Sequence, residues 1–102
     1  MQKLSAIIIT HNEEKNIGRC LKSLQDVADE MILVDSNSTD STIAIAKQYQ
    51  AKVFQKAWMG YSDQKNYANS LAENDFILSM DADEALSDEL KANILTLKET
   101  GF

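Results

Sequence analysis

Residues 76–83 have the sequence Phe76-Ile77-Leu78-Ser79-Met80-Asp81-Ala82-Asp83, an apolar run followed directly by two carboxylates. The apolar part has the length of a buried strand, so Asp81 and Asp83 are expected at its exit. The side chains of residues i and i+2 point to the same side of an extended chain, so both carboxylates can contact the same ligand. Two close carboxylates repel unless a cation lies between them, which favours Mg2+ or Mn2+ with a phosphate partner. The alternative is that both residues cap the next helix.

Earlier apolar runs end in polar residues in the same way. Residues 4–9 and 31–34 are short and rich in β-branched residues, which is typical of parallel strands buried on both faces. Thr10 follows the first run and Asp35 follows the second, and residues 52–55 form a further short strand. The two carboxylates after residue 80 are therefore part of a repeated pattern.

Helical patterns fill the intervals between the strands. Asn12 is expected to cap the first helix, with Glu13 and Glu14 in its first turn, and Ser87 to cap the last. A second helix is expected over residues 41–49, and a third after Gly60. The residues expected to face the core have helical spacing: Ile17, Leu21 and Leu24, then Tyr67, Ala68 and Leu71, then Leu86, Leu90, Ile94 and Leu97.

The strand and helix order βαβαβαβα predicts an α/β, Rossmann-like domain. We expect a parallel sheet of about four strands with helices on both faces. Ligands of such sheets bind beyond the carboxyl ends of the strands. The first and fourth strands should be neighbours, with Asp35, Asp81 and Asp83 at one rim.

The composition restricts the class of function. With 102 residues the chain forms one small domain, and its net charge of −6 argues against nucleic-acid partners and polybasic membrane contacts. A single cysteine, Cys20, excludes an internal disulfide and indicates a reducing compartment such as the cytoplasm. Cys20 lies in an apolar helix pattern, which favours a core position over a nucleophile.

Four segments resemble the N-terminal half of a family 2 glycosyltransferase of the GT-A fold. They are residues 9–14, 33–40, 64–66 and 78–84, and they occur in the order that the family shows. Residues 60–84 also resemble a subgroup that adds glucose to the inner core of bacterial lipopolysaccharide. The resemblance implies inverting transfer of a sugar, such as glucose, from a UDP-sugar to a glycan or lipopolysaccharide-type acceptor.

The resemblance also implies roles for individual residues. Asp83 resembles the metal ligand of a DXD motif that holds Mn2+ or Mg2+ on the donor diphosphate. Asp81 resembles the neighbouring aspartate of that motif, which contacts the ribose or the metal. Asp35 resembles the carboxylate that binds uracil. Lys65 occupies a position where the family usually carries arginine, whose planar fork lysine lacks. The nucleotide-sugar-binding residues implied by the resemblance are Thr10, Asn12, Glu13, Asp35, Lys65 and Asp81.

Several of these residues have a structural alternative. Glu13 could favour a helix dipole instead of the ribose, Glu84 could be a first-turn acid, and Asp40 is expected to be a helix cap. His11 has no identifiable orienting partner and is expected to form packing or a pocket wall. For Trp58 and Tyr61 we expect cover for the sheet, with a donor-sugar wall as the alternative.

Enzymes of this family are longer than 102 residues and use an Asp or Glu general base, which we expect beyond residue 102. The chain is therefore expected to be the truncated donor half, inactive alone and prone to self-association through a bare strand edge. A lipid-linked acceptor and peripheral contact with the inner face of the cytoplasmic membrane would involve the missing regions. Two alternatives are a non-catalytic nucleotide-binding or interaction module completed by another chain, and a receiver-type domain, which would normally carry Asp where the third strand ends in Gln55.

Overall fold

The computed structural model describes residues 2–101 and alternates strands with helices along the chain. Its strands are β1 (Leu4–Thr10), β2 (Glu30–Asp35), β3 (Lys52–Gln55) and β4 (Phe76–Asp81). Its helices are α1 (Ile17–Leu24), α2 (Thr42–Gln48), α3 (Tyr61–Leu71) and α4 (Asp88–Thr100). All neighbouring strands pair in parallel, in the order β3-β2-β1-β4. The predicted α/β fold is confirmed, and the first and fourth strands are neighbours.

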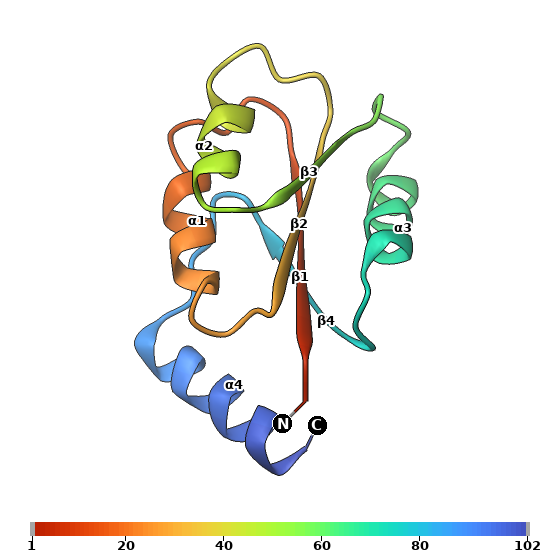
Figure 1. Ribbon diagram of the computed structural model, residues 1–102. Coiled ribbons are helices and arrows are strands. Elements are labelled where there is room, and N and C mark those ends of the chain that lie inside the picture. Colours follow the sequence, from red (N-terminus) through yellow and green to blue (C-terminus); the bar gives the residue numbers. More distant parts are fainter. Residues whose placement is uncertain (1, 102) are drawn as a thin grey trace.

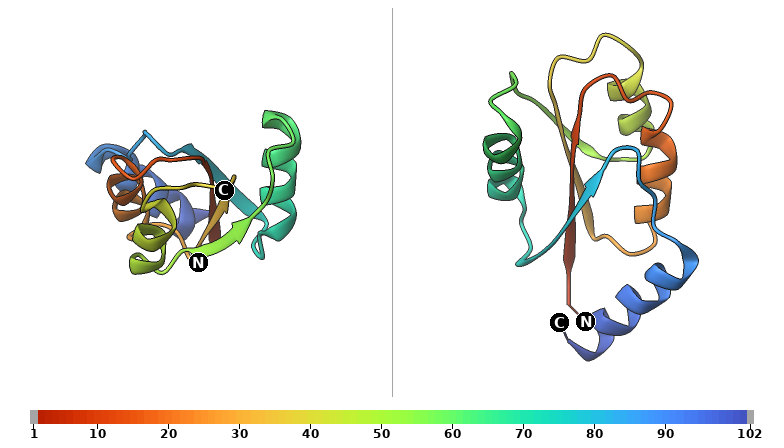
Figure 2. Two further views of the ribbon diagram at one scale, coloured as in Figure 1. Left: turned by 90° about the horizontal axis from the view of Figure 1, so that it is seen from above. Right: turned by 180° about the vertical axis from the view of Figure 1, so that it is seen from behind.

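The sheet lies between two helical layers. Helices α1 and α2 cover one face and α3 covers the other, while α4 lies beyond the lower end of α1 in Figure 1 and in the right-hand view of Figure 2. Ala6 and Ile8 of β1 pack with the α1 side, and Ile7 between them packs with Ala68 of α3. This alternation follows from the two-residue period of a strand. The central strands β1 and β2 are therefore buried on both faces, as their uninterrupted apolar runs indicate. The outer strands β3 and β4 are partly exposed, so the expectation that residues 76–80 form a buried strand is wrong.

The strand register brings the predicted acidic residues to one rim. Thr10 is paired with Asp35 across β1 and β2, and Ile9 is paired with Asp81 across β1 and β4. The carboxyl ends of these three strands therefore lie side by side. Ligands of open parallel sheets bind at this edge.

The first helix begins later than expected. Its N-cap is Asn16, and no acidic residue lies in its first turn, so the predicted positions of Asn12, Glu13 and Glu14 at the helix start are wrong. Asn12 instead has a left-handed backbone with φ of 51°. Asparagine tolerates this conformation better than most residues, and here it turns the chain out of β1.

The last helix packs differently from the apolar pattern. The Ser87 cap is confirmed, because its side chain accepts a hydrogen bond from the Leu90 backbone N–H. Leu86 and Ile94 pack against the core, but Leu90 and Leu97 are 50% and 45% exposed, so the prediction is wrong for these two. The buried position belongs to Lys98, whose Nζ donates to the Val27 carbonyl at 2.7 Å and to Asp29 Oδ2 at 2.8 Å.

Within residues 2–101, no helix has the length and apolar character needed to cross a bilayer.

Candidate functional site

A cleft of about 330 Å³ opens at the carboxyl ends of β1 and β4, and we call it the acidic cleft. Among the predicted binding residues, it brings together Thr10, Glu13, Asp81 and Asp83. Asn12, Asp35 and Lys65 are not among its lining residues. The full lining is Ile9, Thr10, His11, Glu13, Trp58, Tyr61, Asp81, Ala82 and Asp83.

Hydrogen bonds within the turn and from α1 and α3 hold the turn that carries the two aspartates. Both carboxylates are exposed to solvent. The Tyr61 hydroxyl donates to Asp81 Oδ1 at 3.5 Å, and the Asp81 backbone N–H donates to Glu84 Oε1 at 3.0 Å. Glu84 therefore closes the turn, and it is not a first-turn acid of α4. Arg19 of α1 donates from Nη2 to the Asp83 carbonyl at 2.9 Å, which ties the turn to the helical layer.

The acidic pair suits a divalent cation that is shared with a phosphate ligand. In residues 2–101 no group of three or more His, Cys, Asp or Glu side chains could hold a metal. Asp81 and Asp83 supply hard oxygen ligands at a solvent-open rim. Mg2+ is usually bound by one or two carboxylates together with water and substrate phosphates. The residues present therefore fit such an ion, with the remaining coordination left to the ligand and to water.

Asp35 ends β2 and is completely buried. One carboxylate oxygen accepts from the Thr10 hydroxyl at 2.7 Å and from the Ser38 hydroxyl at 2.5 Å, and the other accepts from the Ser38 backbone N–H at 2.8 Å. Asp35 thus joins the end of β1 to the loop after β2. The structure places it behind the rim, in contact with other protein groups.

Asn12 joins the same two loops from the solvent side. Its backbone N–H donates to the Ser38 hydroxyl at 2.8 Å, and its side-chain oxygen accepts from the Thr39 backbone N–H at 2.8 Å. The left-handed conformation of Asn12 makes both contacts possible. Asn12 therefore shapes the rim without lining the acidic cleft.

A second hollow of about 370 Å³ adjoins the acidic cleft, and we call it the aromatic hollow. It is lined by His11, Ser36 and Trp58, and His11 and Trp58 also line the acidic cleft. His11 Nδ1 lies 2.6 Å from the Ser36 carbonyl oxygen, so Nδ1 carries the hydrogen and donates. Of the two roles expected for His11, packing or a pocket wall, the pocket wall is confirmed. The expectation that His11 lacks an orienting partner is wrong, because the Ser36 carbonyl accepts its hydrogen bond. Trp58 and Tyr61 are 57% and 55% exposed, so the expectation that they mainly cover the sheet is wrong.

Lys65 lies on α3, outside both cavities. Its ammonium group is 4.9 Å from the centroid of the Tyr61 ring, in a cation–π contact. Tyr61 in turn lines the acidic cleft. Lys65 can therefore act on the cleft through the position of Tyr61.

The remaining alternatives are resolved by local contacts. Asp40 accepts from the Thr42 backbone N–H and hydroxyl and from the Glu14 backbone N–H. The N-cap of α2 is Ser41, so Asp40 lies one residue before the cap position. Glu13 precedes α1 and lines the acidic cleft. Burial, and then the negative charge of Glu84, raises the pKa of the Cys20 thiol to about 11. Cys20 is therefore a core residue and not a nucleophile.

Sequence reasoning missed Arg19 and Ser38. The spacing of Ser38, three residues after Asp35, is that of a side-chain-bonded turn and could have revealed its contact. Arg19 and Asp83 are 64 positions apart, and no local pattern marks their contact. Both residues hold the loops that form the site.

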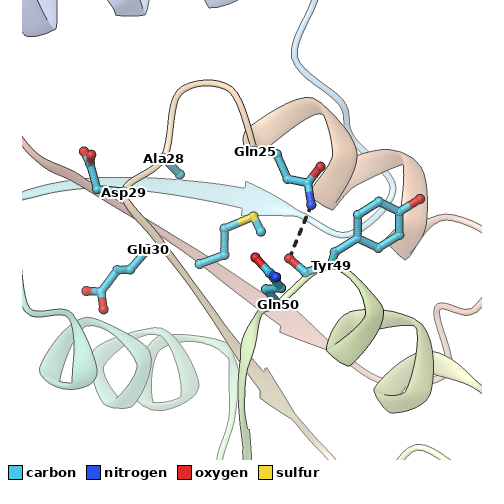
Figure 3. Close-up of a pocket in the computed structure, with 7 residues that line it drawn as sticks. Gln25, Ala28, Asp29, Glu30, Tyr49 and Gln50 are labelled. Atoms are coloured by element: carbon cyan, nitrogen blue, oxygen red, sulfur yellow. Dashed lines mark hydrogen bonds between the residues drawn. The ribbon is translucent and has the colours of Figure 1, made fainter.

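A further hollow of about 230 Å³ opens at the opposite rim and is shown in Figure 3. Its wall includes Asp29 and Glu30 at the start of β2, and Gln25 Nε2 donates to the Tyr49 carbonyl at 3.4 Å. This is the amino end of the sheet. The acidic cleft and the aromatic hollow, at the carboxyl end, are therefore the candidate site.

Several relatives of the chain are glycosyltransferases. An uncharacterised glycosyltransferase of Rickettsia felis is 54% identical over 94 residues, which are 92% of this chain and 33% of that protein. The lipopolysaccharide core biosynthesis glycosyltransferase LpsC of Rhizobium meliloti is 38% identical over 86% of this chain and 34% of its own length. The chain thus spans about a third of the length of these relatives.

Some solved structures with the same fold contain UDP. The structure of S. aureus TarS, residues 1–349, superposes with a TM-score of 0.80 at 33% sequence identity. The match covers 96% of this chain and 33% of the TarS chain, and another structure of TarS contains UDP. A structure of glucosyl-3-phosphoglycerate synthase of Mycobacterium tuberculosis with Mn2+ and UDP superposes with a TM-score of 0.71 at 22% sequence identity. The match covers 79% of this chain and 33% of the synthase chain, and at this identity it shows the fold alone. The model of the family described as "Glycosyl transferase family 2" matches residues 5–101. The chain therefore belongs to glycosyltransferase family 2.

Proposed function

We propose that this chain binds the donor of an inverting glycosyltransferase that uses a UDP-sugar. The observation that carries the proposal is the acidic cleft, in which Asp81 and Asp83 lie at the carboxyl end of β4 beside Thr10 and Glu13. The UDP bound to TarS, a protein 30% identical to this chain in that structure, supports the nucleotide. The pairing of carboxylates with aromatic walls suits a ligand that has both phosphates and rings.

Asp83, with Asp81, would hold a divalent cation, Mn2+ or Mg2+. When bound, the cation supplies positive charge to the departing diphosphate. Arg19 holds the turn through the Asp83 carbonyl, and Tyr61 orients Asp81. The protein thus holds the turn that carries both carboxylates before the nucleotide arrives, which reduces the ordering cost of binding.

We further propose that an Asp or Glu outside residues 1–102 acts as the general base and removes the proton of the acceptor hydroxyl. Attack on the anomeric carbon from the face opposite the diphosphate inverts the configuration, and the bond to the diphosphate oxygen breaks as the new glycosidic bond forms. The 38% identity to LpsC supports a lipopolysaccharide-type acceptor. A lipid-linked acceptor of this kind would place the whole protein at the inner face of the cytoplasmic membrane.

Calorimetric titration of this chain with UDP, in Mn2+ and in EDTA, tests the proposal. UDP should bind in Mn2+ at least tenfold more tightly than in EDTA, and Asp83→Asn should remove that difference while leaving the fold intact, because its side chain is exposed. Asp75→Asn is a matched control, since Asp75 is an exposed aspartate just before the other end of β4. Equal UDP affinity in both buffers, or equal effects of the two variants, would contradict the metal site.

A further inference from the structure

Trp58 lies between the acidic cleft and the aromatic hollow and lines both. The side chain is 57% exposed, which is unusual for the largest apolar residue in a small domain. An exposed aromatic group beside a cavity marks a binding surface, because a ligand that covers it removes apolar area from water. The position of Trp58 therefore favours a ligand that has an apolar face.

The loop around Trp58 is anchored on both sides. Gln64 of α3 is completely buried, and its amide donates to the Lys56 carbonyl at 3.2 Å and accepts from the Met59 backbone N–H at 3.3 Å. The Lys56 backbone N–H donates to the Asp35 carbonyl at 2.9 Å. Gly60 then turns the chain into α3 with φ of 97°, a conformation that favours glycine. These hydrogen bonds hold the backbone on either side of Trp58, so an ordered loop exposes the indole to solvent.

The aromatic hollow has the chemistry of a site for a planar ring. Two of its three lining residues, His11 and Trp58, carry flat rings, and the hydrogen bond from His11 to the Ser36 carbonyl fixes the imidazole. Bases stack on aromatic side chains with a gain that depends little on charge. The adjoining acidic cleft suits a cation and phosphates. A molecule with a base at one end and phosphates at the other can therefore occupy the aromatic hollow and the acidic cleft together.

We infer that Trp58 stacks on the base of the nucleotide and is the wall of its nucleoside pocket that determines affinity for the base. The base occupies the aromatic hollow and the diphosphate occupies the acidic cleft. This inference rests on the proposed function, because it assumes that a nucleotide binds at this rim. It goes further by assigning the recognition of the base to a residue that projects from the loop between β3 and α3.

Trp58 is the only tryptophan of the chain, so its fluorescence reports directly on the contact. In Mn2+, UDP should quench the emission, uridine should quench it at higher concentration, and pyrophosphate should leave it unchanged. By calorimetry, Trp58→Ala should weaken UDP on the order of tenfold and pyrophosphate less than twofold. Trp58→Phe keeps a flat ring and should retain most of the affinity. Met59→Ala is the matched control, since Met59 is exposed on the same loop and lines neither cavity.

The outcomes separate this inference from the proposed function. If the unaltered chain binds UDP in Mn2+ and Trp58→Ala binds it equally well, the role of Trp58 is overturned and the donor site stands. Equal losses for UDP and pyrophosphate would also overturn it, since Trp58 would then act on the phosphates or on the fold, which circular dichroism of the variant tests. If the unaltered chain does not bind UDP in Mn2+, the proposed function fails and the inference fails with it.

Discussion

Replacement of Asp35 by alanine should destabilise the fold and loosen the rim. The Asp35 carboxylate is fully buried and accepts three hydrogen bonds, from the Thr10 hydroxyl and from the hydroxyl and backbone N–H of Ser38. Asp35→Ala leaves these donors without their acceptor. Thr10 is itself 2% exposed, so water cannot readily replace the lost oxygen.

The expected magnitude follows from these contacts. A hydrogen bond to a charged group contributes about 1.5–3 kcal/mol, which gives about 4.5–9 kcal/mol for the three bonds. Removing a buried charge also removes its desolvation cost, which is several kcal/mol. We therefore expect a net loss of about 3 kcal/mol, a large part of the roughly 5–15 kcal/mol that stabilises a domain.

Urea unfolding followed by circular dichroism measures this loss. Ser38→Ala keeps the backbone N–H that donates to Asp35 but removes two hydroxyl contacts, the donation to Asp35 and the acceptance from the Asn12 backbone N–H. It should cost about 2 kcal/mol, less than Asp35→Ala. Asp75→Ala serves as the control, because Asp75 is exposed at the opposite rim. A change of less than about 0.5 kcal/mol for Asp35→Ala, within the range of ordinary surface substitutions, would refute the structural role of its carboxylate.

The same variant tests the predicted contact between Asp35 and uracil. Under conditions where Asp35→Ala remains folded, it should weaken UDP more than pyrophosphate, because Ser36 in the adjoining loop lines the aromatic hollow. Calorimetry with both ligands in Mn2+ measures the difference. Parallel losses would mean that Asp35 acts on the metal site or on the fold and not on the base.

Three further predictions concern groups outside the donor site. Burial alone would raise the pKa of Glu30, but hydrogen bonds from Ser5, the Glu73 backbone N–H and Lys52 hold the pKa below its ordinary value. The ionised Glu30 therefore stabilises the fold above pH about 4.5, and this stabilisation is lost as the pH falls through the folded pKa. In urea unfolding at several pH values, the free energy of unfolding of Glu30→Gln should fall less in acid than that of the unaltered chain, and an equal fall would contradict this. Cys20, with a pKa of about 11 and a buried side chain, should react with a thiol reagent near pH about 8 only on unfolding, whereas rapid labelling of the native chain would count against its core position. Strand β4 is an outer strand of the sheet in residues 2–101, so sedimentation should show self-association that rises with concentration; a monomer throughout would disprove it.

The rim of the sheet could be predicted because it depends on short-range rules. Apolar runs of strand length mark where each strand ends, and a parallel sheet brings those ends to the same edge. Asp81 and Asp83 lie at this rim because Asp81 ends β4 and Asp83 follows it by two residues. The same rules place Thr10 opposite Asp35. Where strand length and alternation decide the position of a residue, the sequence is sufficient.

Positions that depend on distant partners could not be predicted. Asn12 and Asn16 are both suitable helix caps, and the choice between them follows from the contacts that Asn12 makes with Ser38 and Thr39, 26 and 27 positions away. Lys98 takes the buried position of α4 because the Val27 carbonyl and Asp29 meet its ammonium group. Neither choice follows from helical spacing, because the deciding partners come from other elements.

The charge of the rim indicates that the two cavities contribute differently to nucleotide binding. The chain carries a net charge of −6, and Glu13, Asp81 and Asp83 face the space proposed for an anionic diphosphate. Like charges at short range oppose association, so the phosphates gain affinity only when a cation offsets the carboxylates. Stacking on Trp58 has no such requirement, because it depends on apolar area and ring geometry. In the proposed site the aromatic hollow therefore supplies affinity for the nucleoside with or without metal, while the acidic cleft makes recognition of the diphosphate conditional on the cation.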